Sequence, residues 1–241
     1  NVSKVNNKKK EPRNDPPDKP GKHRTEMDSH ADQCCVGNNA HILYDWPDIS
    51  VEVGPFLRSL GCIPSAPIVT AGVVYDDPTT GRPVLIIIHQ AIYIKGLKHN
   101  LLCPMQLRHN GISMNERPKH CTPIPTREDH SILFEDRNYF IPLSIHGVTS
   151  YFPTRTPTKE EALKFEEAGD YLELTSDASE WEPNSTRFSE LESRLIDRYG
   201  ELKEGITSNI RQLFPVVTDR DLYKPFRKLK IYATSTKHPG T

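Results

Sequence analysis

The sequence predicts a mainly β fold, and two observations carry this prediction. Between about Thr25 and Pro153, short runs of β-branched and other apolar residues alternate with clusters of Pro, Gly, Asp and Asn. Only one short segment of this region has the features of a helix. The 21 Pro among 241 residues and the clearly negative mean hydropathy indicate that much of the chain is not packed core. We therefore expect one folded domain with loose ends.

The β-rich region divides into strands, hairpins and one helix. The expected strands are SVEV, PIVTAGVVY, PVLIIIHQAIYI and NYFIPLSIHGV. Residues 51–73 read as a long, loose hairpin, and residues 76–82 supply the turn residues of a tighter one. The segment PMQLRHNG predicts the short helix, because Pro104 suits a first helical turn and Gly111 a left-handed stop.

The two flanks have different compositions. Residues 1–24 are basic and almost without apolar side chains, so burial cannot offset the entropy of ordering them, and we expect a disordered linker. Residues 154–241 read as an acidic, partly helical spacer. Its stronger helix candidate is residues 185–214, where apolar residues recur at steps of three and four from Phe188 to Leu202. Residues 159–174 show this spacing only weakly, and we expect the stronger helix to lie on a surface.

Charge and cysteine content exclude several classes of protein. A formal net charge of −1 gives the chain as a whole no electrostatic attraction to nucleic acid or anionic membranes. No apolar run approaches the roughly 18 to 20 residues of a membrane span, and the basic start lacks the apolar stretch of a signal peptide. Five irregularly spaced Cys do not form a disulfide framework, so we expect reduced thiols in the cytoplasm. The start at Asn and the abrupt end suggest a piece of a longer protein.

The stretch EMDSHADQCCVG, residues 26–37, brings together several residue types that catalyse reactions in enzymes: two Asp, a Ser, a His and two adjacent Cys. A carboxylate at the end of a strand, followed by a hydroxyl residue and a tight turn, can be held where a second carboxylate approaches it. Two such carboxylates share one proton, so one acts as a base on water while the other donates to a substrate carbonyl. No second loop of this kind follows, but a two-fold homodimer would place Asp28 of one subunit beside Asp28 of the other.

Two motifs in the same order resemble a known family. MDSHAD is similar to the D-[TS]-G-A-D loop of retroviral and retrotransposon aspartic proteases, with His30 in place of the Gly. LKHNLLCPMQLRHNG is similar to the NLLS-x-x-Q-L-x-x-x-G segment of copia-type retrotransposon polyproteins. The resemblance covers roughly residues 25–115. It implies a retropepsin-like closed barrel over residues 25–153, and the tail KIYATSTKHPGT resembles a stretch that leads into an integrase region.

The resemblance also implies roles for individual residues. Asp28 would be the catalytic carboxylate, and Ser29 the hydroxyl that ties the two loops of the dimer together. Ala31 and Asp32 would contact the substrate backbone. Leu101 and Leu102 would brace the loop from a neighbouring strand, and residues 54–66 would form a flap that excludes water. The implied activity is cleavage of the protein's own polyprotein in a virus-like particle, without a cofactor.

Three other interpretations of the sequence stay open. His30 brings a titratable ring close to the dyad, where the family has a Gly that lets backbones approach, so the domain could be an inactive dimerisation or interaction module. His30, Asp32, Cys34 and Cys35 are metal-ligand or nucleophile types, but adjacent Cys do not reach one zinc ion easily, and we expect no metal. The basic groups of the N-terminal linker could contact phosphates, although we expect neighbouring polyprotein modules to bind nucleic acid.

Overall fold

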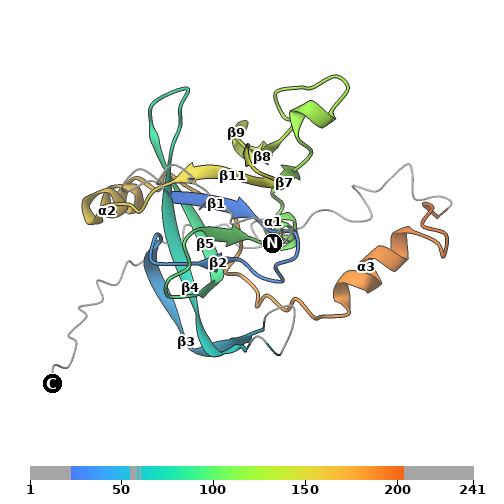
Figure 1. Ribbon diagram of the computed structural model, residues 1–241, viewed down its shortest axis with the longest axis horizontal. Coiled ribbons are helices and arrows are strands. Elements are labelled where there is room, and N and C mark those ends of the chain that lie inside the picture. The colour runs from blue at the N-terminus through green and yellow to red at the C-terminus, as the bar shows by residue number, and fades with distance from the viewer. Residues whose placement is uncertain (1–22, 55–58, 60, 204–241) are drawn as a thin grey trace, which may run out of the picture.

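The computed structural model describes residues 23–54, 59 and 61–203, and within them the fold is mainly β (Figure 1). The larger sheet contains β1 (His23–Met27), β2 (Cys35–Val36), β3 (His41–Val53), β4 (Ile63–Asp76), β5 (Pro83–Tyr93), β6 (Asn100–Leu102), β10 (Ser144–His146), β11 (Thr149–Thr154) and β12 (Tyr171–Glu173). A smaller sheet consists of β7 (Ser113–Asn115), β8 (Ser131–Phe134) and β9 (Tyr139–Pro142). The 3₁₀ turns η2 (Lys119–Cys121) and η3 (Glu135–Arg137) lie beside it in the chain. No helix in the described ranges is long and apolar enough to cross a membrane.

The predicted closed barrel is not found among the described strands. Eight of the nine strands of the larger sheet run in the order β10-β11-β1-β6-β2-β5-β4-β3, and β12 pairs with β5 outside this order. The strands β10 and β3 at the two ends do not pair with each other. The sheet curls only far enough for one bridge, in which Val74 of β4 and Arg155 exchange backbone hydrogen bonds of 2.8 and 2.9 Å. β11 pairs with β1 on one side and, through residues 149–151, with β10 on the other.

The predicted tight hairpin is confirmed. β4 and β5 pair antiparallel, and the turn between them closes with the Asp77 amide donating to the Arg82 carbonyl at 3.0 Å. The Asp77 carboxylate accepts hydrogen bonds from the amides of Thr79 and Thr80, and Gly81 has a φ of 70°. The looser hairpin is also present as β3 and β4, but residues 55–58 and 60 of the predicted flap lie outside the described residues.

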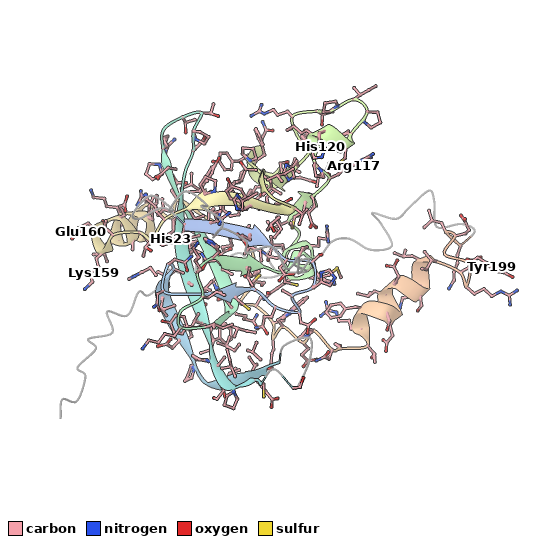
Figure 2. All side chains as sticks on the ribbon, viewed as in Figure 1. His23, Arg117, His120, Lys159, Glu160 and Tyr199 are labelled. Atoms are coloured by element: carbon pink, nitrogen blue, oxygen red, sulfur yellow. The ribbon has the colours of Figure 1, made fainter. Side chains whose placement is uncertain are left out.

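Three α-helices form in the described chain. α1 (Pro104–His109) is the short helix that the sequence predicts, and α2 (Lys159–Ala168) forms where the predicted spacing was weak. α3 (Arg187–Leu195) ends before Leu202, the last residue of the predicted apolar spacing, and residues 204–214 of the predicted helix lie outside the described residues. Asp197 ends it, since its carboxylate accepts hydrogen bonds from two following amides and its own amide bonds to the Glu201 carbonyl. Figure 2 shows Tyr199 beyond α3, far from the sheet.

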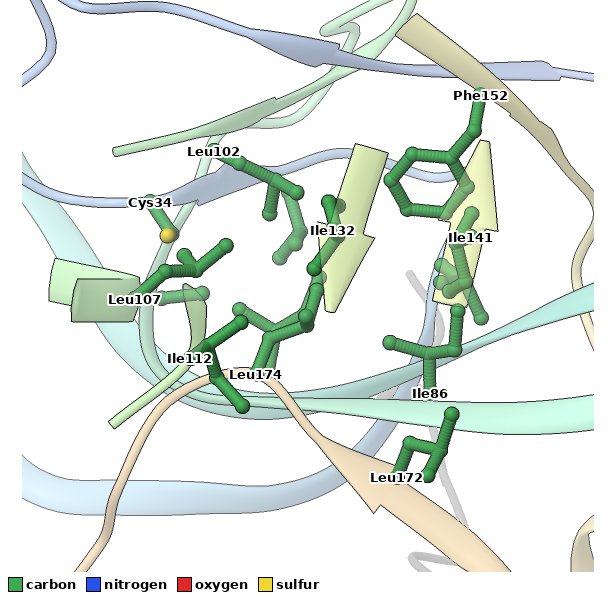
Figure 3. Close-up of a cluster of buried hydrophobic side chains, with 14 of the residues drawn as sticks. Cys34, Ile86, Leu102, Leu107, Ile112, Ile132, Ile141, Phe152, Leu172 and Leu174 are labelled. Carbon is green, nitrogen blue, oxygen red and sulfur yellow. The ribbon is translucent and has the colours of Figure 1, made fainter. Parts of the chain in front are cut away.

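Both predicted flanks contribute strands to the sheet. The predicted linker, residues 1–24, overlaps the start of β1. Its residues 1–22 lie outside the described residues, whereas His23 and Arg24 belong to β1 and pair with β11. In the predicted spacer, β12 pairs parallel with β5 and places Leu172 and Leu174 in the main core. Figure 3 shows these two side chains facing the same cluster as Ile86. Fully buried members of that cluster include Cys34, Ile86, Leu102, Leu107, Ile132, Ile141, Phe152 and Leu174.

Candidate functional site

Residues 28–32 form a loop that leaves β1 and is anchored at its start. The amide of Asp28 donates to the carbonyl of Leu102 at 3.0 Å, which continues the parallel pairing of β1 with β6. The amide of Ala31 donates back to the carbonyl of Asp28 at 3.2 Å, which closes a turn. Met27, just before the loop, is buried. Asp28 therefore sits at a defined position at the end of a half-buried strand.

The strand β6 lies between β1 and β2, although those two strands follow each other along the chain. Leu101 pairs with Glu26 of β1 and with Cys35 of β2, so β6 holds both ends of the loop. Leu102 is fully buried in the main core, whereas Leu101 packs on the smaller cluster around Ile92. The two leucines thus lie beside the loop, on opposite faces of the sheet.

Asn100 ties the same strands together and was not singled out as a site residue from the sequence. Its side-chain oxygen accepts a hydrogen bond from the Gly37 amide at 3.2 Å, and its amide nitrogen donates to the Thr25 hydroxyl at 3.3 Å. The residue is fully buried. Asn100 is the first residue of the NLL segment in the second sequence motif, which is the signal that could have identified it.

The Asp28 side chain is partly exposed and is oriented by its own loop. Its Oδ1 accepts a hydrogen bond from the His30 amide at 3.0 Å. The buried thiol of Cys35 lies close enough to interact with it electrostatically: burial, and then the charge of Asp28, raise the pKa of Cys35 to about 11. A neutral thiol is therefore the neighbour of the Asp28 carboxylate at neutral pH.

Ser29 and His30 are exposed and contact each other. The Ser29 hydroxyl lies 3.4 Å from Nδ1 of His30, so its hydrogen-bond partner is a residue of the same loop. The imidazole of His30 therefore lies on the surface of the loop.

Ala31 and Asp32 lie on the side of the loop that leads into β2. Ala31 is half-buried and packs against the main core, whereas the Asp32 side chain is exposed. The backbone carbonyl of Asp32 accepts a hydrogen bond from the indole nitrogen of Trp181 at 2.8 Å. This contact comes from the predicted spacer, and no sequence pattern pointed to it.

Helix α1 braces the exit from the loop. The side-chain oxygen of Gln106 accepts a hydrogen bond from the Cys34 amide at 2.9 Å, and the Cys103 amide donates to the Cys34 sulfur at 3.2 Å. Gln33 donates through its side chain to the carbonyl of Gln90 on β5 at 2.6 Å. Gln106 lies inside the second sequence motif, which is the signal that could have identified it.

The thiols near the loop are poorly suited to nucleophilic or metal chemistry. Burial raises the pKa of Cys34 well above its ordinary value, and burial also raises that of Cys103. A thiol acts as a nucleophile or ligand mainly as the thiolate, which these surroundings disfavour. Among the described residues, no group of three or more His, Cys, Asp or Glu side chains is arranged to hold a metal ion.

Comparison with known proteins does not assign the chain to a family. A scan against protein-family models, a search of curated proteins and a search of solved structures each find no match.

Proposed function

We propose that this chain is an aspartic endopeptidase of a copia-type retrotransposon polyprotein and that it acts as a homodimer with a retropepsin-like fold. The observation that carries the proposal is the placement of Asp28. It follows a half-buried strand, its backbone is fixed by the inserted strand β6, and its carboxylate is oriented by the loop while remaining accessible. The loop thus offers one ordered and partly exposed carboxylate that a second copy of the chain would approach.

In the proposed mechanism, the two Asp28 carboxylates of the dimer share one proton. The ionised carboxylate takes a proton from water, and the resulting hydroxide attacks the carbonyl carbon of the scissile peptide. The protonated carboxylate donates to the carbonyl oxygen, which gives a neutral tetrahedral intermediate. Proton transfer to the amide nitrogen then breaks the C–N bond and releases a carboxylic acid and an amine.

The other residues of the loop position the reaction. Ser29 would tie the two loops across the dimer axis, and Ala31 and Asp32 would bind the peptide backbone. The hairpin of β3 and β4 would supply the flap. Leu101 and Leu102 hold the loop from β6. We propose the protein's own polyprotein as the substrate and an intracellular virus-like particle as the setting, with nucleic acid bound by neighbouring modules.

The alternative is a catalytically inactive dimerisation or interaction module with the same fold. It is favoured by the contact between the Ser29 hydroxyl and the His30 ring, which competes with a contact to a second subunit. The size of His30 also opposes close approach of two loops, for which a Gly would leave room.

The test is cleavage of a longer precursor that extends beyond both ends of this chain, at mildly acidic pH. We expect the wild type to cut the precursor at a rate that rises with dimer concentration, and we expect Asp28→Asn to abolish cutting. Asp170→Asn is the matched control, because Asp170 is exposed and pairs only at 3.6 Å with Arg82. Circular dichroism would verify that each variant is folded.

A folded and dimeric wild type that leaves the precursor intact would contradict the proposal. In that case, His30→Gly separates two causes. Restored cutting would identify His30 as the residue that silences the loop, whereas continued inactivity would favour the interaction module.

A further inference from the structure

The segment that follows β12 crosses from the sheet to the candidate site. We call residues 174–188 the strap. It begins as a continuation of the sheet, where the Leu174 amide donates to the Ile87 carbonyl at 2.9 Å and the Thr175 hydroxyl donates to the His89 carbonyl at 2.8 Å. Leu174 and Thr175 are fully buried, so this end of the strap is part of the core.

Gln90 of β5 then binds the strap through both the nitrogen and the oxygen of its side-chain amide. Its Nε2 donates to the carbonyls of Ser176 and Ser179 at 2.8 and 2.6 Å, and its Oε1 accepts from the Trp181 amide at 2.8 Å. Gln90 is buried and has a φ of 51°, a left-handed conformation that is uncommon for a residue other than Gly. Its backbone carbonyl accepts the Gln33 hydrogen bond, so Gln90 links the strap directly to the end of the Asp28 loop.

Trp181 brings the strap onto the loop itself. Its indole nitrogen donates to the Asp32 carbonyl at 2.8 Å. Its ring lies 5.8 Å from that of His109 on α1 and 5.4 Å from that of Phe188 on α3. The rings of His109 and Phe188 are 4.6 Å apart, so Trp181 and Phe188 of the strap form one aromatic cluster with His109 of α1.

The packing beneath the strap is incomplete. Beside these contacts, a pocket lies between the strap, α1 and β5, and the polar side chains of Gln90, Gln106, His109, Asn110 and Glu180 line it. Trp181 itself is only partly buried. Protein interiors are normally close-packed, so a segment that leaves a polar pocket beneath it is released at lower cost than a core element.

We propose that the strap is a cis-acting inhibitory segment that occupies, with Trp181, the substrate side of the Asp28 loop. This inference rests on the proposed function. An extended peptide binds next to a strand mainly through backbone hydrogen bonds, and the Asp32 carbonyl is the acceptor that such a peptide would use. Trp181 already donates to that carbonyl, and Glu180 and Glu182 are its neighbours in the chain. Substrate therefore competes with the strap for the same edge of the loop.

The experiment measures cleavage in trans near neutral pH, with the Asp28→Asn precursor as the substrate. The enzymes are the full chain, Trp181→Phe, Trp181→Ala and the control Tyr199→Phe. Trp181→Phe keeps an aromatic ring but removes the N–H that bonds to Asp32, and Tyr199 is 73% exposed and outside the strap. We expect Trp181→Phe to cut about fivefold faster than wild type, as the loss of one hydrogen bond predicts. We expect Trp181→Ala to cut faster still, and Tyr199→Phe to match wild type.

A synthetic peptide of residues 176–188, added in trans, tests whether the same contacts inhibit when the segment is not part of the chain. Added in excess, it should slow Trp181→Ala towards the wild-type rate, and the same peptide with Ala in place of Trp should not. Limited proteolysis within residues 176–188 reports independently whether the variants release the strap.

The outcomes separate this inference from the proposed function. Active wild type with unchanged or slower Trp181 variants would overturn inhibition by the strap, and slower variants would show that it braces the loop. If no enzyme cuts the precursor although proteolysis shows that Trp181→Ala has released the strap, both the inference and the proposed peptidase activity are wrong.

Discussion

At the scale of the residue, Gly37 shows how closely the chain packs behind the candidate loop. A Cβ at this position would lie 2.4 Å from the backbone oxygen of Leu97 and 3.0 Å from its Cβ. The Gly37 amide also donates to Asn100, so the residue cannot move aside without breaking that hydrogen bond. The close approach of the two backbone segments therefore requires a residue without a side chain.

We expect Gly37→Ala to lower the free energy of unfolding by about 2 kcal/mol, because the added methyl group overlaps backbone. Urea denaturation followed by circular dichroism measures the change. Gly54→Ala is the matched control, since a Cβ there meets nothing within 4 Å and its stability should change little. Equal stability of the two variants would contradict the close contact at Leu97.

At the scale of the element, α1 and the strap meet at His109. Burial of the ring, and then the nearby charge of Arg187, lower the pKa of His109 below its ordinary value of 6.5. His109 lines the pocket between the strap, α1 and β5, and the other charged side chains that line this pocket are Glu180 and Glu182 of the strap. Because the docked state has the lower pKa, the released state binds the proton more readily. Docking is therefore fully stable above about pH 6.5 and is lost as the pH falls through the lowered pKa.

We expect protease cleavage within residues 174–188 to accelerate as the pH falls from about 7 to 5, with the midpoint below 6.5. His109→Phe should remove this acceleration, because it keeps an aromatic ring against Trp181 and Phe188 but has no titrating group. His146→Phe serves as the control, because His146 lies in β10. An acceleration that persists in His109→Phe would assign the pH effect to another group.

At the scale of the whole molecule, the region predicted as a spacer is partly structural. β12 adds to the sheet beside β5, and the side chain of Leu174 is fully buried in the main core. The sheet, the strap and α1 therefore share one set of contacts, and the predicted boundary at residue 153 does not separate the core from the segment that follows.

We expect Leu174→Ala to lower the free energy of unfolding by about 3 kcal/mol, which is typical of a Leu truncated in a packed core. Leu163→Ala on α2 is the matched control: its side chain is 51% exposed, and its cost should stay below about 0.5 kcal/mol. Chemical denaturation of both variants makes the comparison. A small effect at Leu174 would mean that β12 is not part of the cooperative unit.

Predictions from the sequence succeeded where neighbouring residues decide the structure. The turn of Asp77 to Gly81 and the start of α1 at Pro104 follow from local backbone preferences and short-range hydrogen bonds. Over residues 196–203 the predicted helix does not form, because Asp197 satisfies the following amides in a turn and apolar spacing alone does not show this competition.

The amino-acid sequence by itself determined the mainly β character of this protein and the chemistry of the loop that carries Asp28. These properties depend on side-chain type and on residues a few positions apart. Only the tertiary structure decided that β6 is inserted between β1 and β2, that the sheet stays open at β10 and β3, and that Trp181 bonds to Asp32 across 149 positions of the chain. Such contacts depend on which distant surfaces fit together once the core has packed, and no spacing within a single sequence encodes that fit.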